Sequence, residues 1–255
     1  MNPIIKIFKP LADFLFTLLF WLYTIFGFLF FYLPALIGLS LFIKNRETKF
    51  QKMNHYYYNG FFRGMNTLVP GLDIKVSEDV KAIRSSIIIS NHRSYLDPIL
   101  MISIFQKHKT IVKGVFFKVP FINWAMKSGG YIPYTPSISY NDLMSESMKN
   151  IPEFINDGGN VFIFPEGRRS RDGRLGKFQK GAFSIAKKYN LPVQVIFIKN
   201  TERLFTPGKF FLNTCVLNTI TVEKLGTIKP SDATLQEMKK EAIALYEKRL
   251  KQDNI

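Results

Sequence analysis

The stretch Ser86-Ile-Ile-Ile-Ser-Asn91-His92-Arg-Ser-Tyr-Leu-Asp97-Pro98 decides the fold predicted for this chain. Within it, Ile87-Ile88-Ile89 is an apolar, β-branched run that is typical of a buried strand. A polar loop follows, and the segment from Pro98 to about Phe105 is expected to form a helix. Loops that lead from a strand to a helix in α/β proteins often carry catalytic or binding residues. This junction is therefore the first candidate for a functional site.

Two residues of this loop have the chemistry of a catalytic pair. The imidazole of His92 can act as a general base near neutral pH, and the carboxylate of Asp97 can hold that ring in one tautomer. The alternative is structural: Asp97 caps the helix, Pro98 is its first residue, and His92 is an ordinary loop histidine. The stretch alone leaves both interpretations open, because His and Asp at this spacing also arise by chance.

The composition limits the possible partners and metal sites. The chain has 255 residues, enough for one catalytic domain and an appendage, and a formal net charge of +16. Such a charge requires an acidic partner, which is nucleic acid, an anionic membrane or a phosphorylated substrate. Cys215 is the single cysteine, so an internal disulfide is excluded. The histidines show no pair at ligand spacing, so we expect no metal site.

Residues 11–43 predict a membrane anchor. Apart from tyrosines, Asp13 is the only ionisable residue in this phenylalanine-rich stretch. The apolar core of a signal peptide is much shorter, so we expect insertion into a membrane. We place an N-terminal hydrophobic helical membrane anchor at residues 1–50 and the catalytic domain at residues 51–255.

The anchor is expected to be a two-helix hairpin. One helix of about 33 residues would be roughly 50 Å long, more than the ~30 Å hydrocarbon core of a bilayer. Gly27, Pro34 and Gly38 are possible break points. Basic residues flank both ends, which favours a return to the same side of the membrane. These residues are Lys6, Lys9, Lys44, Arg46, Lys49 and Lys52. A single tilted span is the alternative.

Strands and helices alternate after residue 70. Strands are expected at 72–76, 86–90, 110–113, 160–164, 193–198 and 216–225; helices are expected at 98–105, 121–127, 139–155, 180–189 and from Pro230 to about Lys251. This order predicts an α/β fold, with a mostly parallel central sheet flanked by helices. An aromatic cluster beside basic residues at 56–62 suits a membrane–water interface. Because no nucleic-acid motif accompanies the cluster, we expect no nucleic-acid partner.

A second polar loop, Pro165-Glu-Gly-Arg-Arg-Ser170, follows the strand predicted at 160–164. Gly167 has no side chain, so a ligand could approach the backbone there. The guanidinium groups of Arg168 and Arg169 are suited to bidentate phosphate binding. The alternative is a solvated basic loop held by anionic lipid headgroups. Glu166 fits that alternative poorly, because a carboxylate within a basic loop needs a structural or binding role.

Together these stretches resemble the PlsC-like 1-acyl-sn-glycerol-3-phosphate (lysophosphatidate) acyltransferase family. Asn91-His92 to Asp97 matches the family's NHx4D motif, and residues 164–170 resemble its FPEGTRS motif, with Arg168 where threonine is usual. Further matches are Gly173, Leu175, Phe178, Gly181, Leu191-Pro192-Val193, and Lys113 with Pro120 and Gly129-Gly130. The resemblance covers roughly residues 80–205. At the family's second motif, Tyr134 stands where an arginine is usual, which puts the acceptor lipid in doubt.

The resemblance implies roles for individual residues. His92 would be the general base, and Asp97 would orient it. Arg169, with Lys113 and Arg168, would neutralise the phosphate of the acceptor, and Glu166 would help to position its glycerol portion. Gly167 and Ser170 complete the substrate-binding motif, and backbone N–H groups near Pro98 or Gly167 could bind the oxyanion. Ser94 is expected to be a loop or capping residue and not a nucleophile.

The implied reaction moves a fatty acyl group from acyl-CoA or acyl carrier protein to the sn-2 hydroxyl of lysophosphatidic acid, giving phosphatidic acid. No cofactor or metal is expected, because the acyl thioester is a co-substrate. The partners would be membrane lipids, a lysophospholipid acceptor and the acyl donor. The location would be a bacterial inner membrane, with the catalytic domain on the cytoplasmic face. The alternatives are another acceptor (a lyso-ornithine lipid or lysophospholipid), a thioester hydrolase, and a non-catalytic lipid-binding protein.

Overall fold

The computed structural model describes residues 3–42, 46–120, 122–134, 147–170, 174–231 and 233–253. The chain forms two compact units, each built from separate segments. Unit 1 comprises Met1–Lys75, Arg93–Gln106 and Lys199–Thr221, and unit 2 comprises Val76–His92, Lys107–Ile198 and Val222–Ile255. Lys44, Phe121, Gly173, Asp232 and residues 139–146, which entered the predictions above, lie outside the described residues.

The N-terminal part of unit 1 is a long apolar helical run. It consists of α1 (Pro3–Gly27), the π-helical segment η1 (Phe28–Tyr32) and α2 (Leu33–Phe42). Within it, Ile7–Leu39 is long and apolar enough to cross a membrane, and only 11% of its most apolar window is buried. The π-helical segment lies between Gly27 and Pro34, but the helical run does not reverse there. The hairpin expected within the anchor is therefore not formed by these residues.

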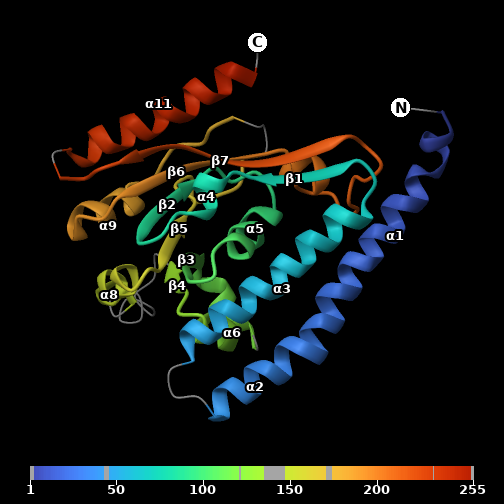
Figure 1. The fold of residues 1–255 in the computed structure, drawn as a ribbon, viewed down its shortest axis with the longest axis horizontal. Helices are drawn as coiled ribbons and strands as arrows, with labels where there is room; N and C mark the ends of the chain where they lie inside the picture. Colours follow the sequence, from blue (N-terminus) through green and yellow to red (C-terminus); the bar gives the residue numbers. More distant parts are fainter. Residues whose placement is uncertain are drawn as a thin grey trace. The chain divides into compact units, whose positions relative to one another are not determined.

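The chain reverses after α2, and the returning helix is α3 (Glu47–Leu68). In Figure 1, α3 (cyan) runs beside α1 and α2 (blue). The Tyr23 hydroxyl donates to the Tyr57 carbonyl at 2.6 Å, and the Tyr57 hydroxyl donates to the Tyr23 carbonyl at 2.9 Å. A Cβ at Gly27 would lie 2.4 Å from the Tyr57 hydroxyl, so glycine permits this close approach. Residue 50 falls inside α3, and the division of the chain there stays a prediction.

Unit 1 also contains α5 (Leu96–Ile104), α10 (Thr201–Leu204) and most of β1 (Leu72–Val76). The helix α5 packs against α3, where His55 Nδ1 lies 3.3 Å from the Ile102 carbonyl and Asn59 donates to the Ser103 carbonyl at 3.2 Å. In the aromatic cluster of α3, Tyr56 is exposed, whereas Phe61 and Phe62 are buried. The prediction that the whole cluster faces a membrane interface is therefore wrong for these two phenylalanines.

Unit 2 is built on parallel strands. The strands are β2 (Ser86–Ser90), β3 (His108–Lys113), β4 (Ile132–Tyr134), β5 (Asn160–Ile163), β6 (Val193–Lys199) and β7 (Asn218–Ile228), in the order β7-β6-β2-β5-β3-β4, with β1 as the other neighbour of β7. The pairings β2–β5, β2–β6, β3–β4 and β3–β5 are all parallel. In register, Ile88 pairs with both Phe162 and Gln194. The mostly parallel sheet predicted from the sequence is confirmed.

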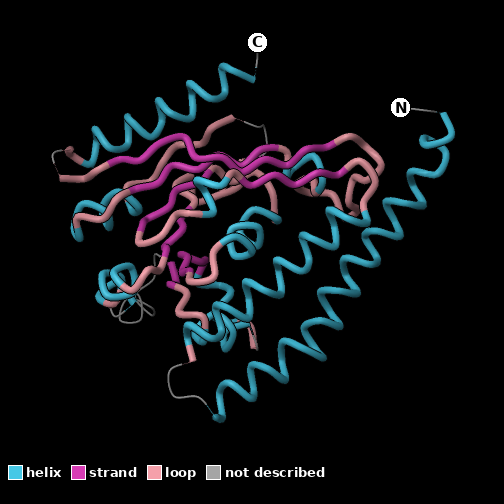
Figure 2. The backbone as a smooth tube through the Cα atoms, viewed as in Figure 1, coloured by secondary structure: helices cyan, strands magenta, loops and turns pink. Residues whose placement is uncertain are grey.

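The helices of unit 2 are α4 (Glu78–Lys81), α6 (Ile122–Ser128), α8 (Ile151–Asn156), α9 (Gly181–Tyr189) and α11 (Leu235–Asp253), with a 3₁₀ segment at Gly114–Lys118. Figure 2 shows helices and strands alternating along this part of the chain. Side chains of α8, α9 and α11 share a core with alternate residues of the central strands, such as Ile87, Ile89, Val161 and Val195. Side chains alternate between the two faces of a strand, so these helices pack on one face of the sheet.

Several predicted bounds need correction. The strand β7 begins and ends later than predicted. Of the helix predicted at 139–155, residues 139–146 lie outside the described residues, residues 147–149 are helical, and α8 begins at Ile151 after a turn at Asn150. The helix α11 begins at Leu235 and not at Pro230, because Thr234 and Glu237 form a capping box. Glu237 accepts from the Thr234 N–H at 2.7 Å, and the Glu237 N–H donates to the Thr234 hydroxyl at 3.3 Å.

Candidate active site

The candidate site lies in unit 2, where four parallel strands end. Because these strands are parallel and in register, their carboxyl ends lie at one edge of the sheet. His92 follows β2, residues 164–170 follow β5, and Lys113 and Tyr134 end β3 and β4. In open α/β sheets, ligands bind at the carboxyl ends of the strands. The topology therefore brings both predicted motifs to a common edge.

His92 is held by the loop that follows β5. Its backbone N–H donates to Glu166 Oε1 at 3.1 Å, and its carbonyl accepts from the Ser170 N–H at 2.8 Å. The imidazole ring is stacked on the ring of Phe164, with 4.3 Å between the ring centroids and 25° between the planes. The backbone and the ring of His92 are therefore both positioned by residues 164–170.

Glu166 is almost buried, with 6% of its surface exposed. Its second oxygen, Oε2, accepts from the Gly176 N–H at 2.8 Å, so the carboxylate connects two loops. A Cβ at residue 176 would lie 2.6 Å from Oε2, which explains why glycine occupies that position. Gly167 has φ of 68°, and its N–H closes a turn onto the Phe164 carbonyl at 3.0 Å. These contacts favour a structural role for Glu166 over contact with a glycerol group.

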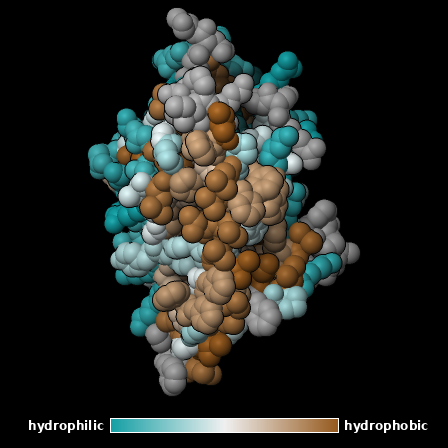
Figure 3. Space-filling view, turned by 90° about the vertical axis from the view of Figure 1, so that its right-hand side faces the viewer, coloured by the Kyte–Doolittle hydropathy of each residue, from teal (hydrophilic) through white to brown (hydrophobic). Residues whose placement is uncertain are grey.

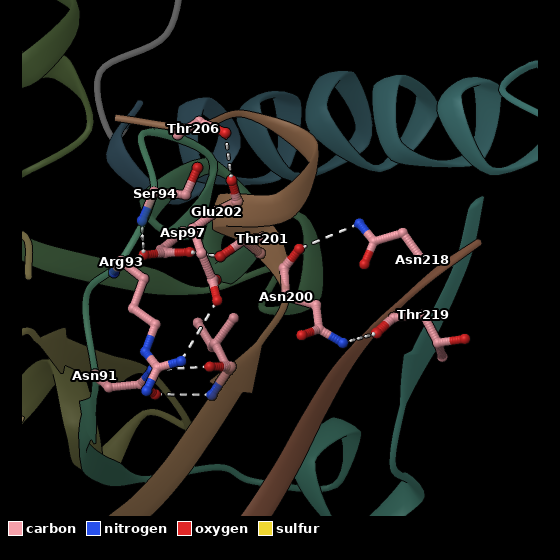
Figure 4. Close-up of polar contacts among 11 residues, drawn as sticks. Asn91, Arg93, Ser94, Asp97, Asn200, Thr201, Glu202, Thr206, Asn218 and Thr219 are labelled. Atoms are coloured by element: carbon pink, nitrogen blue, oxygen red, sulfur yellow. Dashed lines mark hydrogen bonds and ion pairs between the residues drawn. The ribbon is translucent and has the colours of Figure 1, made fainter. Parts of the chain in front are cut away.

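Two further residues fix the end of β2, and the sequence analysis gave neither a role. The amide of Asn91 donates to the Ile198 carbonyl and accepts from the Ile198 N–H, both at 2.8 Å, as a strand residue would (Figure 4). Tyr246 of α11 donates to the Ile196 carbonyl at 2.8 Å, and the Ile89 carbonyl lies 3.3 Å away. Burial, and after it the Glu166 carboxylate, hold the pKa of the Tyr246 hydroxyl well above its ordinary value, so it remains a donor.

Basic residues of β3 and of the loop after β5 lie at the same edge of unit 2. Lys113 and Arg168 are exposed, and Arg169 is half-buried. Tyr134 is 57% exposed and pairs in register with Lys113. At this edge β4 therefore contributes a phenol in place of a cation, and the positive charge comes from β3 and from the loop after β5. Binding of a phosphate by these residues stays a prediction.

Asp97 lies in unit 1 and organises the loop before α5. It is fully buried, and its Oδ2 accepts from the Arg93 N–H at 2.6 Å and from the Ser94 N–H at 2.8 Å. Its Oδ1 accepts from the Thr201 hydroxyl at 2.5 Å (Figure 4). Asp97 is the second residue of α5, whose N-cap is Tyr95, and its side chain folds back onto the preceding loop. The prediction that Asp97 caps a helix beginning at Pro98 is therefore wrong.

The segment after β6 supports this loop. Thr201, the first residue of α10, is fully buried, and Glu202 forms an ion pair with Arg93 at 3.4 Å. Ser94 is buried, donates to the Phe205 carbonyl at 3.0 Å and accepts from the Leu96 N–H at 3.3 Å. These contacts agree with the predicted loop or capping role of Ser94. The position of Thr201 two residues after the end of a buried strand was the available signal for its importance.

His92 belongs to unit 2, and Asp97 belongs to unit 1. The side-chain pairing of His92 with Asp97 stays a prediction. Among the residues that the structure describes, no group of three His, Cys, Asp or Glu side chains is placed to hold a metal ion.

Comparison with known proteins agrees with the motifs and with the fold. A family model described as Acyltransferase matches residues 72–199. A chloroplastic 1-acyl-sn-glycerol-3-phosphate acyltransferase, BAT2 of Brassica napus, is 37% identical over 142 residues, which are 56% of this chain and 40% of that protein. The chloroplastic LPAT1 of Arabidopsis thaliana, with the same described activity, is 36% identical over 140 residues, which are 55% of this chain and 38% of that protein. The matches thus cover less than half the length of these relatives.

A solved structure shows the same fold. It is the crystal structure of the 1-acyl-sn-glycerophosphate acyltransferase PlsC from Thermotoga maritima. The TM-score is 0.71 at 21% sequence identity, and the match covers 98% of this chain and 97% of that chain. At this identity the likeness establishes the architecture.

Proposed function

The chain belongs to the acyltransferase family, whose model matches half of its length, and from that premise we propose that it acylates lysophosphatidic acid. The reaction transfers a fatty acyl group from acyl-CoA or acyl carrier protein to the free sn-2 hydroxyl, and the product is phosphatidic acid. The observation that carries the proposal is the joining of the two motifs at His92. Glu166 and Ser170 bind its backbone, and Phe164 stacks on its ring.

In this mechanism the imidazole of His92 is the general base. A glycerol hydroxyl is a poor nucleophile, so a base must remove its proton while the oxygen attacks the thioester carbonyl. The tetrahedral intermediate collapses, the C–S bond breaks, and the imidazolium returns the proton to the departing thiolate. No acyl-enzyme intermediate is required. A base in this role must be held in a defined position, which the three contacts of His92 provide.

Asp97 would orient His92 and stabilise the imidazolium, as the carboxylate of a catalytic triad does. We assign Thr201 as a positioning residue that acts through Asp97. Its hydroxyl fixes Oδ1 of the carboxylate, and two backbone N–H groups fix Oδ2. A buried carboxylate with these three donors is held in one orientation.

Lys113, Arg168 and Arg169 would bind the phosphate of the acceptor. The end of β3 and the loop after β5 carry these cations at the edge where His92 lies. Gly167 and Ser170 shape the loop that presents them. The cations would attract an acidic acyl donor as well. Because the donor arrives as an activated thioester, the proposed chemistry needs no cofactor and no metal.

The membrane is the proposed place of action, because the acceptor and the product are lipids. The apolar helical run Ile7–Leu39 and the net charge of +16 support association with an anionic membrane. We place the enzyme at a bacterial inner membrane, with its catalytic residues on the cytoplasmic face.

One observation favours a second acceptor class. Tyr134, which is exposed beside Lys113, occupies the position where the family usually has an arginine. If that arginine contributes to phosphate binding, its absence weakens selection for lysophosphatidic acid. Another lysolipid, such as a lyso-ornithine lipid or a lysophospholipid with a larger headgroup, is therefore the second candidate.

An acyl-transfer assay tests both candidates. The purified full chain in phospholipid vesicles would receive either acyl-CoA or acyl carrier protein as donor, with a panel of lysolipids as acceptors. We expect kcat/KM to be highest for lysophosphatidic acid. A higher value for another lysolipid would establish the second candidate. Loss of the thioester at an equal rate with and without acceptor would show a hydrolase and contradict the proposal.

A further inference from the structure

The apolar helix α1 carries a row of polar residues on one side. Lys9, Asp13 and Thr17 are four residues apart, so they share one face of the helix. Thr17 is buried, and the side chains of Lys9 and Asp13 are each 19% exposed. A polar row in an otherwise lipophilic helix requires partners. The partners lie in unit 1, about 200 residues later in the chain.

The row binds the backbone of residues 212–214. Asp13 Oδ1 accepts from the N–H and the hydroxyl of Thr214, both at 2.7 Å. Lys9 donates to the Thr214 carbonyl at 2.8 Å and to Asp13 Oδ2 at 2.6 Å. The Thr17 hydroxyl accepts from the Leu212 N–H at 2.9 Å. These contacts fasten an irregular segment lengthwise along α1 and satisfy three of its backbone polar groups.

The fastened segment presents large apolar side chains to solvent. Phe210 is 63% exposed, Phe211 is 50% exposed and Leu217 is 87% exposed. Phe210 stacks on Trp21 of α1, with centroids 6.0 Å apart and planes at 14°, and Phe211 contacts Phe14 at 6.5 Å. Their exposed surface therefore adjoins that of α1. Exposing three such side chains in one short segment favours an apolar partner.

The adjoining face of α1 is also apolar. Its exposed residues include Ile7, Phe8, Leu11, Phe14, Leu15, Leu18, Leu19, Leu22, Ile25 and Phe26. Figure 3 shows apolar residues gathered in a band on the face of the molecule that carries α1. A helix this apolar is suited to lipid, and the net charge of +16 favours an anionic lipid surface. The occupant of the band is therefore a membrane and not a second protein.

We propose that the segment Phe210–Leu217 is a second membrane-contacting element that enters the lipid together with α1. The polar row Lys9–Asp13–Thr17 holds it there by binding the Leu212 N–H and the N–H and carbonyl of Thr214, which lipid cannot hydrogen-bond. Phe210, Phe211 and Leu217 supply the side chains that contact acyl chains, as phenylalanine and leucine do in segments that lie in a membrane interface. This inference does not depend on which lipid is acylated.

The position of Leu217 permits a direct test. Cys215→Ser first removes the native cysteine. Leu217→Cys is then introduced and labelled with an environment-sensitive fluorophore. The labelled full chain is reconstituted in vesicles of phosphatidylcholine with a minority of phosphatidylglycerol. We expect lipids with doxyl groups on their acyl chains to quench the label at residue 217 several-fold more strongly than a label at Gln236→Cys, an exposed position of α11. Quenching by aqueous iodide and not by doxyl lipids would overturn the proposal. Lipid-independent energy transfer between labelled molecules would show a second copy as the partner and would also overturn it.

The polar row is tested with a matched pair of threonines on α1. Thr17→Val removes the acceptor of the Leu212 N–H, whereas the Thr24 hydroxyl bonds the Phe20 carbonyl within its own helix. We expect Thr17→Val to reduce doxyl quenching at residue 217, and Thr24→Val to leave it unchanged. Equal quenching in both variants would contradict the fastening role of the row. A second label at Leu11→Cys reports on α1 itself and shows whether the helix remains in the lipid.

Discussion

Two buried carboxylates, Asp97 in unit 1 and Glu166 in unit 2, show how the same group can serve two purposes. Each accepts hydrogen bonds from two backbone N–H groups of loops. The donors to Asp97 lie three and four residues before it in the chain. The donors to Glu166 are more distant: His92 lies 74 residues before it, and Gly176 lies 10 residues after it. Asp97 also receives a hydroxyl from Thr201.

Asp97 is oriented mainly by its own loop, whereas Glu166 holds together two loops that are distant in the chain. Both Glu166 oxygens accept from backbone N–H groups, so the carboxylate joins the loop of His92 to the loop of Gly176. The Asp97 carboxylate is fixed by two N–H groups of its own loop and by the Thr201 hydroxyl. We therefore expect substitution of Asp97 to affect chiefly the chemical step, and substitution of Glu166 to affect chiefly the stability and position of the site.

The largest effect is expected from Asp97→Asn. The amide retains the shape of the side chain but loses the charge that would stabilise an imidazolium. We expect kcat to fall by about 10³–10⁴-fold, as it does when the orienting carboxylate of a triad is neutralised. Steady-state kinetics measures this loss, and thermal unfolding serves as the control for folding. A kcat within a few-fold of wild type would show that Asp97 has only a structural role.

Glu166→Gln should have a smaller effect on rate and a clear effect on stability. The amide can still accept at one oxygen, but its NH₂ group faces a backbone N–H that has lost its acceptor. We expect the free energy of unfolding to fall by about 1–3 kcal/mol, and kcat by up to about a hundredfold because His92 shifts. Glu153→Gln, at an exposed position of α8, is the matched control. An unchanged free energy of unfolding with a raised KM would instead indicate that Glu166 contacts the acceptor.

Thr201→Val tests the link between the hydroxyl and Asp97. The two side chains have similar shape, and only the donor is lost. A hydrogen bond to a charged group contributes about 1.5–3 kcal/mol, so we expect kcat to fall by roughly tenfold or more, with KM unchanged.

Thr201→Ser restores the donor and should recover most of that rate. In an Asp97→Asn background, Thr201→Val should cost much less than in wild type, because the two residues act as one unit. Equal losses in both backgrounds would mean that Thr201 acts by packing and not through Asp97.

The smallest effect concerns Gly176. A Cβ there would lie 2.6 Å from Glu166 Oε2, whereas a Cβ at Gly181 would meet no atom within 4 Å. We expect Gly176→Ala to lower the free energy of unfolding by about 1–3 kcal/mol through crowding of the carboxylate. Gly181→Ala should change it by no more than about 0.5 kcal/mol. Denaturant unfolding of the two variants compares them directly, and equal stability would contradict the close approach of Glu166 to residue 176.

The sequence was most informative where local pattern and burial agree. The strands β2 and β5 were predicted because fully buried parallel strands are continuous apolar runs. The start of α11 was misplaced because Pro230 and Ser231 look like a helix start, while the true signal was the capping box of Thr234 and Glu237.

The helix α3 was missed because its buried face is mixed. Gln51 and Asn54 are buried in it beside Phe50 and Phe61, so the apolar periodicity that identifies a helix is interrupted. The reversal of the chain was consequently placed at Gly27, Pro34 or Gly38 and not after Phe42.

In the site, the sequence located the residues but not their partners. His92, Asp97 and Glu166 were identified from motif and chemistry. His92 contacts Ser170, Asp97 contacts Thr201, and Glu166 contacts Gly176. The two residues of each pair do not belong to one helix or strand, so no periodicity in the sequence could predict these contacts. Tyr246 lies in a charged C-terminal helix far from both motifs, and only the fold shows that it supports the ends of β2 and β6.

The central claim is that His92 is the base in acyl transfer to a lysolipid. The most direct measurement is the initial rate of acyl transfer to lysophosphatidic acid by the wild-type chain and by His92→Ala, both reconstituted in the same vesicles. His55→Gln, on α3, is the matched histidine control. We predict that His92→Ala binds the vesicles as wild type does and shows no measurable transfer, while His55→Gln retains it. A purified and folded His92→Ala protein that transfers acyl groups at a rate near that of wild type would contradict the assignment.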